Sequence, residues 1–190
     1  MNLDNVYWVF KKAVPVRTCN HILEHAKKLK FKKGLVGGKT KFEEIKQHRD
    51  SHITWLCDRW IYRTISPFIE KANINAGWNF QWDESEKFQF TVYNKNQYYN
   101  WHYDSIKAKP TGKVRKLSAV VSLNKKEDYE GGRLQFLNNL NFDSEIIECP
   151  ALHHIGSIVV FPSFIWHRVT KVLDGTRCSL VMWNLGEKFK

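Results

Sequence analysis

The sequence predicts a mainly β fold, in which short strands form a sandwich or barrel supported by helices near the N-terminus. Three observations lead to this prediction. Apolar residues recur at helical spacing only in the first part of the chain, up to about residue 76. After Gly77 the pattern changes to alternation, which is the period of a strand, and no long helical pattern returns. Short apolar segments then follow one another at a spacing that is typical of a sandwich or barrel.

Two helices are predicted first. From Val16 to Leu29 apolar residues recur every three or four positions, which indicates an amphipathic helix with a basic outer side. A second helical pattern runs from about Trp55 to Ala72. Pro67 lies inside it and is expected to kink the helix or to start a new one at Ser66. The segment Lys32 to Lys41 is rich in glycine and lysine and is expected to form a mobile loop.

The remainder of the chain is predicted to form strands. In Glu86 to Tyr93 the apolar positions alternate with Gln89, Thr91 and Tyr93. If the apolar face packs on the helices, the polar face lines the interior of the barrel, and a polar interior needs a ligand. The other predicted strands are Leu117 to Leu123, Leu134 to Leu137, Ile158 to Phe161 and Cys178 to Trp183.

The length and composition favour one globular domain. A chain of 190 residues with 43% hydrophobic and 14% aromatic residues is expected to pack as a single unit. We divide it into a helical support over about 1–76 and a β core over about 77–190. No apolar segment resembles a signal peptide or a membrane span, so we expect a cytoplasmic protein without a membrane partner. The cysteines lack a disulfide or zinc pattern and are expected to be reduced and mostly buried: Cys19, Cys57, Cys149 and Cys178.

The chain is strongly basic, with a formal net charge of +11. Such a charge favours acidic partners and leaves nucleic acid open as one of them. A lysine-rich solvated surface that binds no partner is the simpler interpretation. The segment Lys32 to Lys41 contributes to this charge, and we hold two interpretations of it equally: a lid over the substrate entrance, or a solvated connection.

The triplet His102-Tyr103-Asp104 is a candidate metal-binding motif. On an extended segment, residues two apart point to the same face, so the imidazole and the carboxylate can bind one ion together. Two histidines and one carboxylate on one side of an iron ion leave three positions open for oxygen chemistry. The third ligand would be His167, which follows the predicted strand Ile158 to Phe161. An H-x-D triplet alone is a weak signal, so its surroundings decide.

Arg177 supports a site with a cosubstrate. It begins a strand in which Arg177, Ser179, Val181 and Trp183 share one face. A guanidinium that enters a narrow apolar barrel is costly unless a carboxylate binds it through two hydrogen bonds. A dicarboxylate cosubstrate would supply that partner.

Further motifs surround these residues in the C-terminal half of the chain. They are Tyr93 to Asp104, Arg115 to Ser118, Leu123-Asn124, Tyr129 to Leu134, Phe161 to Ser163 with His167 to Val169, and Gly175 to Trp183. As an ordered set, these motifs resemble the prolyl 4-hydroxylase branch of the Fe(II)/2-oxoglutarate dioxygenases. The first eighty or so residues resemble that branch only as a helical support. The resemblance implies a double-stranded β-helix core of the jelly-roll or cupin-like type.

The resemblance also implies roles for individual residues. His102, Asp104 and His167 would be the catalytic metal ligands, and Arg177 would bind the far carboxylate of 2-oxoglutarate. Tyr93 matches a tyrosine that contacts this cosubstrate. Tyr99, Arg115 and Trp183 match positions at the substrate entrance. The sequence departs from the hypoxia-type enzymes at Ser122, where these have a second tyrosine, so Ser179 or a water molecule would complete the cosubstrate contacts.

The implied activity is hydroxylation of a prolyl residue in a peptide or protein, with an acidic substrate favoured by the charge. Fe(II), 2-oxoglutarate and O2 would take part, with ascorbate as an optional cofactor, and succinate and CO2 would be released. Alternatives that stay open are an oxygenase acting on a nucleic-acid base or a free amino acid, and a non-catalytic β-helix binding module. The sequence indicates no oligomeric state.

Overall fold

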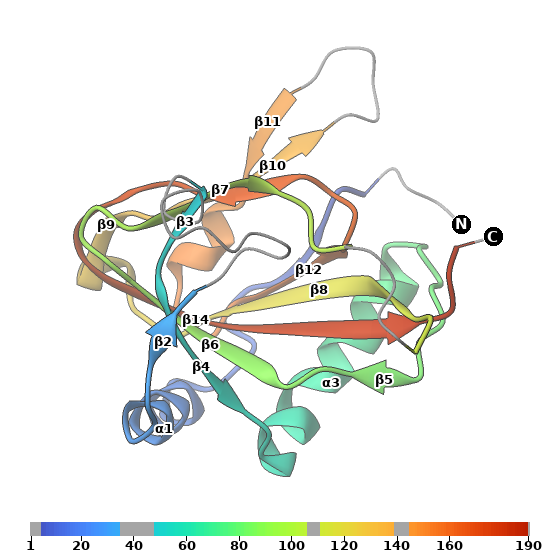
Figure 1. Ribbon diagram of the computed structural model, residues 1–190, viewed down its shortest axis with the longest axis horizontal. Helices are drawn as coiled ribbons and strands as arrows, with labels where there is room; N and C mark the ends of the chain where they lie inside the picture. The colour runs from blue at the N-terminus through green and yellow to red at the C-terminus, as the bar shows by residue number, and fades with distance from the viewer. Residues whose placement is uncertain (1–4, 35–47, 106–110, 139–144, 190) are drawn as a thin grey trace.

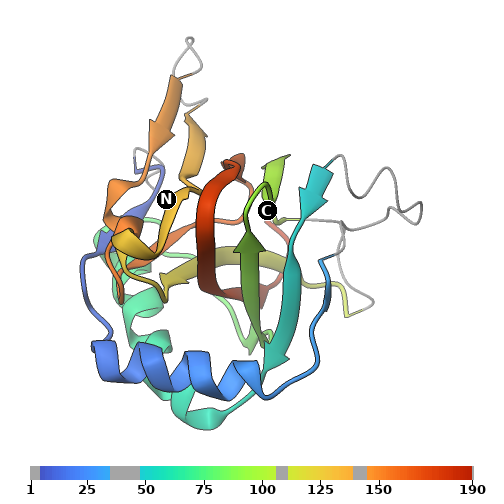
Figure 2. The same cartoon turned by 90° about the vertical axis from the view of Figure 1, so that its left-hand side faces the viewer.

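The computed structural model describes residues 5–34, 48–105, 111–138 and 145–189. Within these residues, two antiparallel sheets form two layers, and the smaller sheet lies above the larger one in the view of Figure 1. Helices α1 (Val16–Lys27) and α3 (Arg59–Asn75) lie against the larger sheet, with α1 in front in Figure 2. The prediction of a mainly β fold with supporting helices is therefore confirmed.

The larger sheet has nine strands in the described residues. Its order is β1-β12-β8-β14-β6-β4-β2, and β5 and β9 pair with β14. Its strands are β1 (Trp8–Phe10), β2 (Lys32–Lys33), β4 (His52–Leu56), β5 (Glu84–Ser85), β6 (Phe88–Asn94), β8 (Val114–Ser122), β9 (Tyr129–Gly131), β12 (Ile158–Pro162) and β14 (Val172–Gly186).

The smaller sheet has five strands in the described residues, in the order β11-β10-β13-β7-β3. Its strands are β3 (Arg49–Asp50), β7 (Tyr98–His102), β10 (Leu134–Asn138), β11 (Glu145–Glu148) and β13 (His167–Val169). Of the short 3-10 helices in the described residues, η1 (Lys126–Asp128) connects β8 to β9 within the larger sheet. The other, η2 (Pro150–His153), connects β11 of the smaller sheet to β12 of the larger one.

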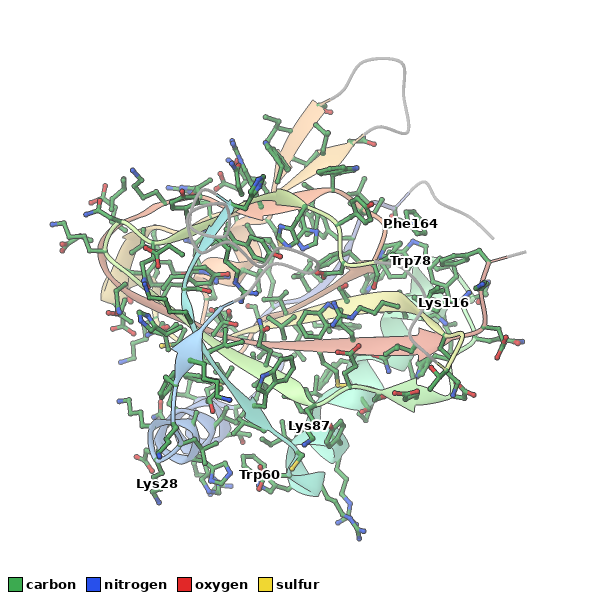
Figure 3. The ribbon with its side chains drawn as sticks, in the orientation of Figure 1. Lys28, Trp60, Trp78, Lys87, Lys116 and Phe164 are labelled. Atoms are coloured by element: carbon green, nitrogen blue, oxygen red, sulfur yellow. The ribbon has the colours of Figure 1, made fainter. Side chains whose placement is uncertain are left out.

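The core has two parts because the larger sheet is covered on both faces. One cluster joins the helices to the outer face of this sheet and includes Ile22, Ile65 and Phe90. Figure 3 shows the extent of the side chains packed here, from Trp60 at the bottom of the view to Phe164 at the upper right. The second cluster lies between the sheets and includes Phe136 of β10 and Phe161 of β12. The larger sheet is thus held between two apolar layers, which gives its strands fixed positions.

The two predicted helices form, with corrected bounds. The first ends at Lys27, and the second begins at Arg59 because Trp55 and Leu56 belong to β4. Pro67 neither ends nor restarts α3, which continues through it. Pro67 lies on an exposed position of the helix, so the carbonyl that loses its hydrogen bond can be solvated by water.

The prediction that the first 76 residues form only a helical support was wrong. Strands β1, β2 and β4 in this part of the chain join the larger sheet, and β3 joins the smaller one. Short strands such as β2 and β3 bury too few residues to produce a readable apolar alternation. In the segment Lys32 to Lys41, the first two residues form β2, and positions 35–41 lie outside the described residues.

The strands predicted after Gly77 are confirmed, together with the faces assigned to two of them. Phe88 and Phe90 of β6 pack in the cluster with the helices, while Gln89 and Tyr93 line a pocket between the sheets. On β14, all four residues that were predicted to share a face line the same pocket. No helix in the described parts of the chain is long and apolar enough to cross a membrane.

The cysteines allow a simple test of this packing. All four are free thiols; Cys57 is exposed, whereas Cys19, Cys149 and Cys178 are buried. Burial raises the pKa of each buried thiol to about 11. Because the thiolate is the reactive form, we expect iodoacetamide to label one cysteine in the native protein and all four in denaturant. Mass spectrometry checks this result, and native labelling of Cys149 would contradict the described core.

Candidate metal centre

The three predicted metal ligands meet at the pairing of β7 with β13. His102 ends β7 and pairs directly with His167, the first residue of β13, and Asp104 follows two residues after His102. Their ligand atoms all lie within 4.8 Å of one another. The carboxylate of Asp104 lies 3.8 Å from Nε2 of His102 and 3.6 Å from Nε2 of His167. The three side chains therefore converge on one point, as a single metal ion requires.

Backbone carbonyls orient both histidines. Nδ1 of His102 lies 2.7 Å from the carbonyl of Asn100, and Nδ1 of His167 lies 2.9 Å from the carbonyl of Ile165. A carbonyl only accepts, so each Nδ1 carries the proton and each Nε2 keeps a lone pair. Both Nε2 atoms face Asp104, which is the arrangement that binds a metal ion.

Hydrogen bonds also fix the carboxylate of Asp104, which is buried. The hydroxyl of Ser118 donates to Oδ2 of Asp104 at 2.8 Å, and the hydroxyl of Ser163 lies 2.9 Å from that of Ser118. The backbone N–H of Asp104 donates to the carbonyl of Ser163 at 2.8 Å. Ser118 of β8 and Ser163, the residue after β12, thus position a ligand that lies outside both strands.

The protonation of the site suits a metal ion. Burial, assisted by the nearby His167, lowers the pKa of His102 to about 3, so its imidazole is neutral near pH 7. Burial alone would raise the pKa of Asp104, but the two histidines and Arg115 lower it to about 2. Neutral imidazole and ionised carboxylate are the forms that bind divalent metal ions. The donor set, two imidazoles and one carboxylate, fits Fe(II) with open positions.

The three ligands open into a pocket of about 810 Å³ between the two sheets. Strands β14 and β6 supply its polar wall, and aromatic residues of both sheets surround it. A pocket of this size holds a small cosubstrate together with part of a larger substrate. Residues that line it include Gln89, Tyr93, Trp101, Trp166, Arg177 and Trp183.

Arg177 lies in this pocket as predicted, with only 3% of its surface exposed. Its Nη1 donates to Oγ of Ser179 at 3.2 Å, and its guanidinium lies 5.5 Å from the ring centre of Tyr93. Gly132, at φ +56°, makes room for it, since a Cβ there would lie 2.9 Å from Cδ of Arg177. Among the described residues, Arg177 forms no ion pair. A buried guanidinium with a hydroxyl as its hydrogen-bond partner fits a carboxylate ligand.

Of the other predicted cosubstrate residues, Tyr93 and Ser179 line the pocket and Ser122 does not. Tyr93 is buried, and burial raises its pKa, so its phenol stays protonated and can donate a hydrogen bond. Ser179 lines the pocket beside Arg177. Ser122 pairs with Ser179 across β8 and β14 and is buried, but it is not among the residues that line the pocket. Of these two serines, only Ser179 is thus among the residues that line the pocket.

The three predicted substrate residues all line the pocket. Arg115 forms two hydrogen bonds with Glu86, at 3.0 and 2.8 Å, and its guanidinium lies 3.9 Å from the ring centre of Trp183. Glu86 therefore neutralises Arg115 and holds it over the indole. Tyr99 stacks on the ring of His102, with ring centres 3.5 Å apart.

Sequence reasoning missed several lining residues of the N-terminal strands. Ile53 and Trp55 of β4 and Arg49 of β3 all face the pocket. Alternation within His52–Leu56 was the available signal for β4, but the helical pattern of the residues after it concealed this signal. Nothing in the sequence indicated that β3 pairs with β7.

Comparisons with known proteins agree with this geometry. The family model of the 2OG-Fe(II) oxygenase superfamily matches residues 88–184. A PKHD-type hydroxylase of Shewanella baltica is 34% identical over 96 residues, which are 50% of this chain and 40% of the relative. PKHD-type hydroxylase YbiX of Escherichia coli is 35% identical over 97 residues, again 50% of this chain and 40% of the relative. The match thus spans about 40% of the length of these curated relatives.

Solved structures share the fold. A prolyl-4-hydroxylase of Pseudomonas putida superposes with a TM-score of 0.70 at 17% identity, over 98% of this chain and 95% of that one. A prolyl hydroxylase of Trichoplax adhaerens was solved with a hypoxia inducible factor peptide fragment. It superposes with a TM-score of 0.73 at 16% identity, over 95% of this chain and 84% of that one. At such identities the likeness shows the fold alone, and it confirms the predicted double-stranded β-helix.

Proposed function

This chain belongs to the 2OG-Fe(II) oxygenase superfamily, and we propose that it hydroxylates a prolyl residue in a peptide or protein substrate. The family and the His-Asp-His set imply Fe(II) and 2-oxoglutarate as its cofactor and cosubstrate. The observation that carries the proposal is that the three ligands and Arg177 line one pocket, and aromatic side chains line it too. Succinate and CO2 would be released as 2-oxoglutarate is consumed.

The residues of this chain would divide the work as follows. His102, Asp104 and His167 would hold Fe(II), which supplies the oxygen chemistry when it is bound. Arg177 would bind the far carboxylate of 2-oxoglutarate and so direct its other end toward the metal ligands. The buried wall around Tyr93 would exclude water from the cosubstrate. These residues would bind and position the reacting molecules. The bonds that form and break would belong to the substrate, 2-oxoglutarate and O2.

The aromatic residues that line the pocket support a prolyl substrate. Trp183 is held by Arg115, and Trp55 lies against it with ring centres 6.2 Å apart. A proline ring is rigid and apolar, so an aromatic wall can orient it at a small cost in conformational entropy. The fold neighbours from Pseudomonas putida and Trichoplax adhaerens are prolyl hydroxylases, and the latter was solved with a peptide. These likenesses support the substrate class proposed for this chain.

A comparison of substrate classes tests the proposal. Purified protein with Fe(II), 2-oxoglutarate and ascorbate is offered proline-containing peptides, free amino acids or methylated oligonucleotides, and succinate is measured. We expect peptides to stimulate succinate formation, with hydroxyproline detected by mass spectrometry. A matched peptide with alanine in place of proline is the control and should give no stimulation. Stimulation by an oligonucleotide or a free amino acid alone would reject the prolyl substrate and retain the oxygenase.

A further inference from the structure

Strand β7 contains an irregularity next to the metal ligand His102. Across the pairing with β13, His102 lies opposite His167 and Tyr99 lies opposite Val169. Three steps along β7 thus match two steps along β13, so β7 carries one extra residue, which is a β-bulge. In a regular strand, Tyr99 and His102 would point to opposite faces because they are three residues apart.

The bulge turns both rings into the pocket, where they stack. The ring centres of Tyr99 and His102 lie 3.5 Å apart, and the rings are inclined by only 10°. The carbonyl of Asn100, inside the bulged segment, accepts the hydrogen bond from Nδ1 of His102 at 2.7 Å. The bulge therefore supplies two restraints: the carbonyl limits rotation within the imidazole plane, and Tyr99 limits its tilt.

A third group extends the stack from the N-terminal part of the chain. Arg49 of β3 pairs with Tyr99 of β7, and its guanidinium carbon lies 4.6 Å from the centre of the Tyr99 ring. The Tyr99 ring therefore contacts both the imidazole of His102, at 3.5 Å between ring centres, and this guanidinium. Nε of Arg49 donates to Oγ of Ser51 at 2.8 Å, which fixes the guanidinium over Tyr99.

The backbone of Gly34 closes the stack behind Arg49. The N–H of Gly34 donates to the carbonyl of Ser51 at 2.9 Å. A Cβ at Gly34 would collide with Oγ of Ser51 and would lie 2.8 Å from Cζ of Arg49. Both approaches are closer than these atoms tolerate, so a side chain here would displace the guanidinium together with the hydroxyl that holds it. The absence of a Cβ at Gly34 is thus what allows Arg49 to lie on Tyr99.

We propose that Tyr99 is a positioning residue for the metal ligand His102, held in place by Arg49 and Gly34. The other histidine is placed differently. The ring of Phe161 packs edge-on against that of His167, with ring centres 4.7 Å apart and ring planes inclined by 63°. Arg49 and Gly34 lie outside the 88–184 segment that matches the family model. The N-terminal strands would therefore set the geometry of a metal ligand in the segment that matches the family model. This inference rests on the metal centre and does not depend on the prolyl substrate.

Proton NMR of the metal-free protein tests the stack directly. Protons of an imidazole that lies on the face of an aromatic ring resonate upfield, so the His102 ring protons should be shifted upfield in the unaltered protein. Tyr99→Phe keeps the ring and should keep the shift, whereas Tyr99→Leu should return the signals to ordinary values. Ordinary His102 shifts in the unaltered protein would overturn the proposal without any variant.

Metal affinity, measured with Co(II) and without substrate or cosubstrate, tests the consequence. Loss of a group that orients a ligand weakens metal binding by about tenfold or more, and this is expected for Tyr99→Leu but not for Tyr99→Phe. Gly34→Ala should weaken binding in the same direction through Arg49. Trp55→Leu is the matched control, since Trp55 lines the same pocket and its ring contact is with Trp183.

These measurements distinguish a Tyr99 that positions His102 from a Tyr99 that only supports the fold or only contacts the substrate. Thermal unfolding of each metal-free variant shows that it is folded before affinities are compared. Unchanged Co(II) affinity in both Tyr99→Leu and Gly34→Ala would overturn the proposal, as would an equal loss in Trp55→Leu. A Tyr99→Leu protein that binds Co(II) normally but needs more peptide would make Tyr99 a substrate contact only. Failure of every peptide in the substrate comparison would leave the metal result untouched.

Discussion

His167→Ala is expected to abolish metal binding and succinate formation while the protein stays folded. The substitution removes one of three ligands and leaves His102 and Asp104, which cannot hold the ion in its place alone. Mn(II) binding, followed by calorimetry, should fall from one ion per chain to none at micromolar concentrations, and circular dichroism should show the same secondary structure.

A second histidine provides the control for this experiment. His153→Ala removes an imidazole that lies 3.9 Å from Glu148 and lines no part of the metal pocket. Its Mn(II) binding should match that of the unaltered protein. Full succinate formation by His167→Ala would show that the assigned ligands are not the catalytic ones.

Arg177→Ala is expected to raise the 2-oxoglutarate requirement at least a hundredfold with little change in metal affinity. The cosubstrate carboxylate would be left in a buried site without its partner, and breaking a buried ion pair costs about 3–5 kcal/mol. Arg177→Lys should recover only part of the loss, because an ammonium cannot form two parallel hydrogen bonds with a carboxylate. The KM for 2-oxoglutarate, measured at saturating Fe(II), gives the result.

Arg133→Ala is the matched control for this second prediction. Arg133 is an exposed arginine that pairs with Glu148 at 2.6 Å. Its removal changes the net charge by the same amount without touching the pocket, so the KM should stay constant. An unchanged KM in Arg177→Ala would remove Arg177 from the cosubstrate site.

Side-chain direction along single strands was predictable because it is a local property. The period of two assigned Arg177 and Ser179 to one face of a strand, and both line the pocket. The same reasoning separated Gln89 from Phe88 on β6. The prediction that His102, Asp104 and His167 meet needed more than periodicity, since β7 and β13 are distant in sequence. It depended on the resemblance of the ordered motifs to a known family.

Features that depend on strand pairing were not predictable in the same way. Strand β3 is two residues long, and its place beside β7 puts Arg49 over Tyr99. The bulge in β7 reverses the face that a regular alternation would assign to Tyr99 relative to His102. Trp55 was assigned to a helix because the strand β4 ends three residues before α3 begins. In each case a long-range contact overrides or hides the local pattern.

Calorimetric titration of 2-oxoglutarate, without oxygen, into Mn(II)-loaded and metal-free protein tests most directly whether one pocket binds metal and cosubstrate together. With Mn(II), one 2-oxoglutarate should bind per chain. Binding should be much weaker in the metal-free protein, and also in the His167→Ala and Arg177→Ala variants when Mn(II) is supplied. Equal binding with and without metal, or full affinity in both variants, would contradict a shared site formed by the triad and Arg177.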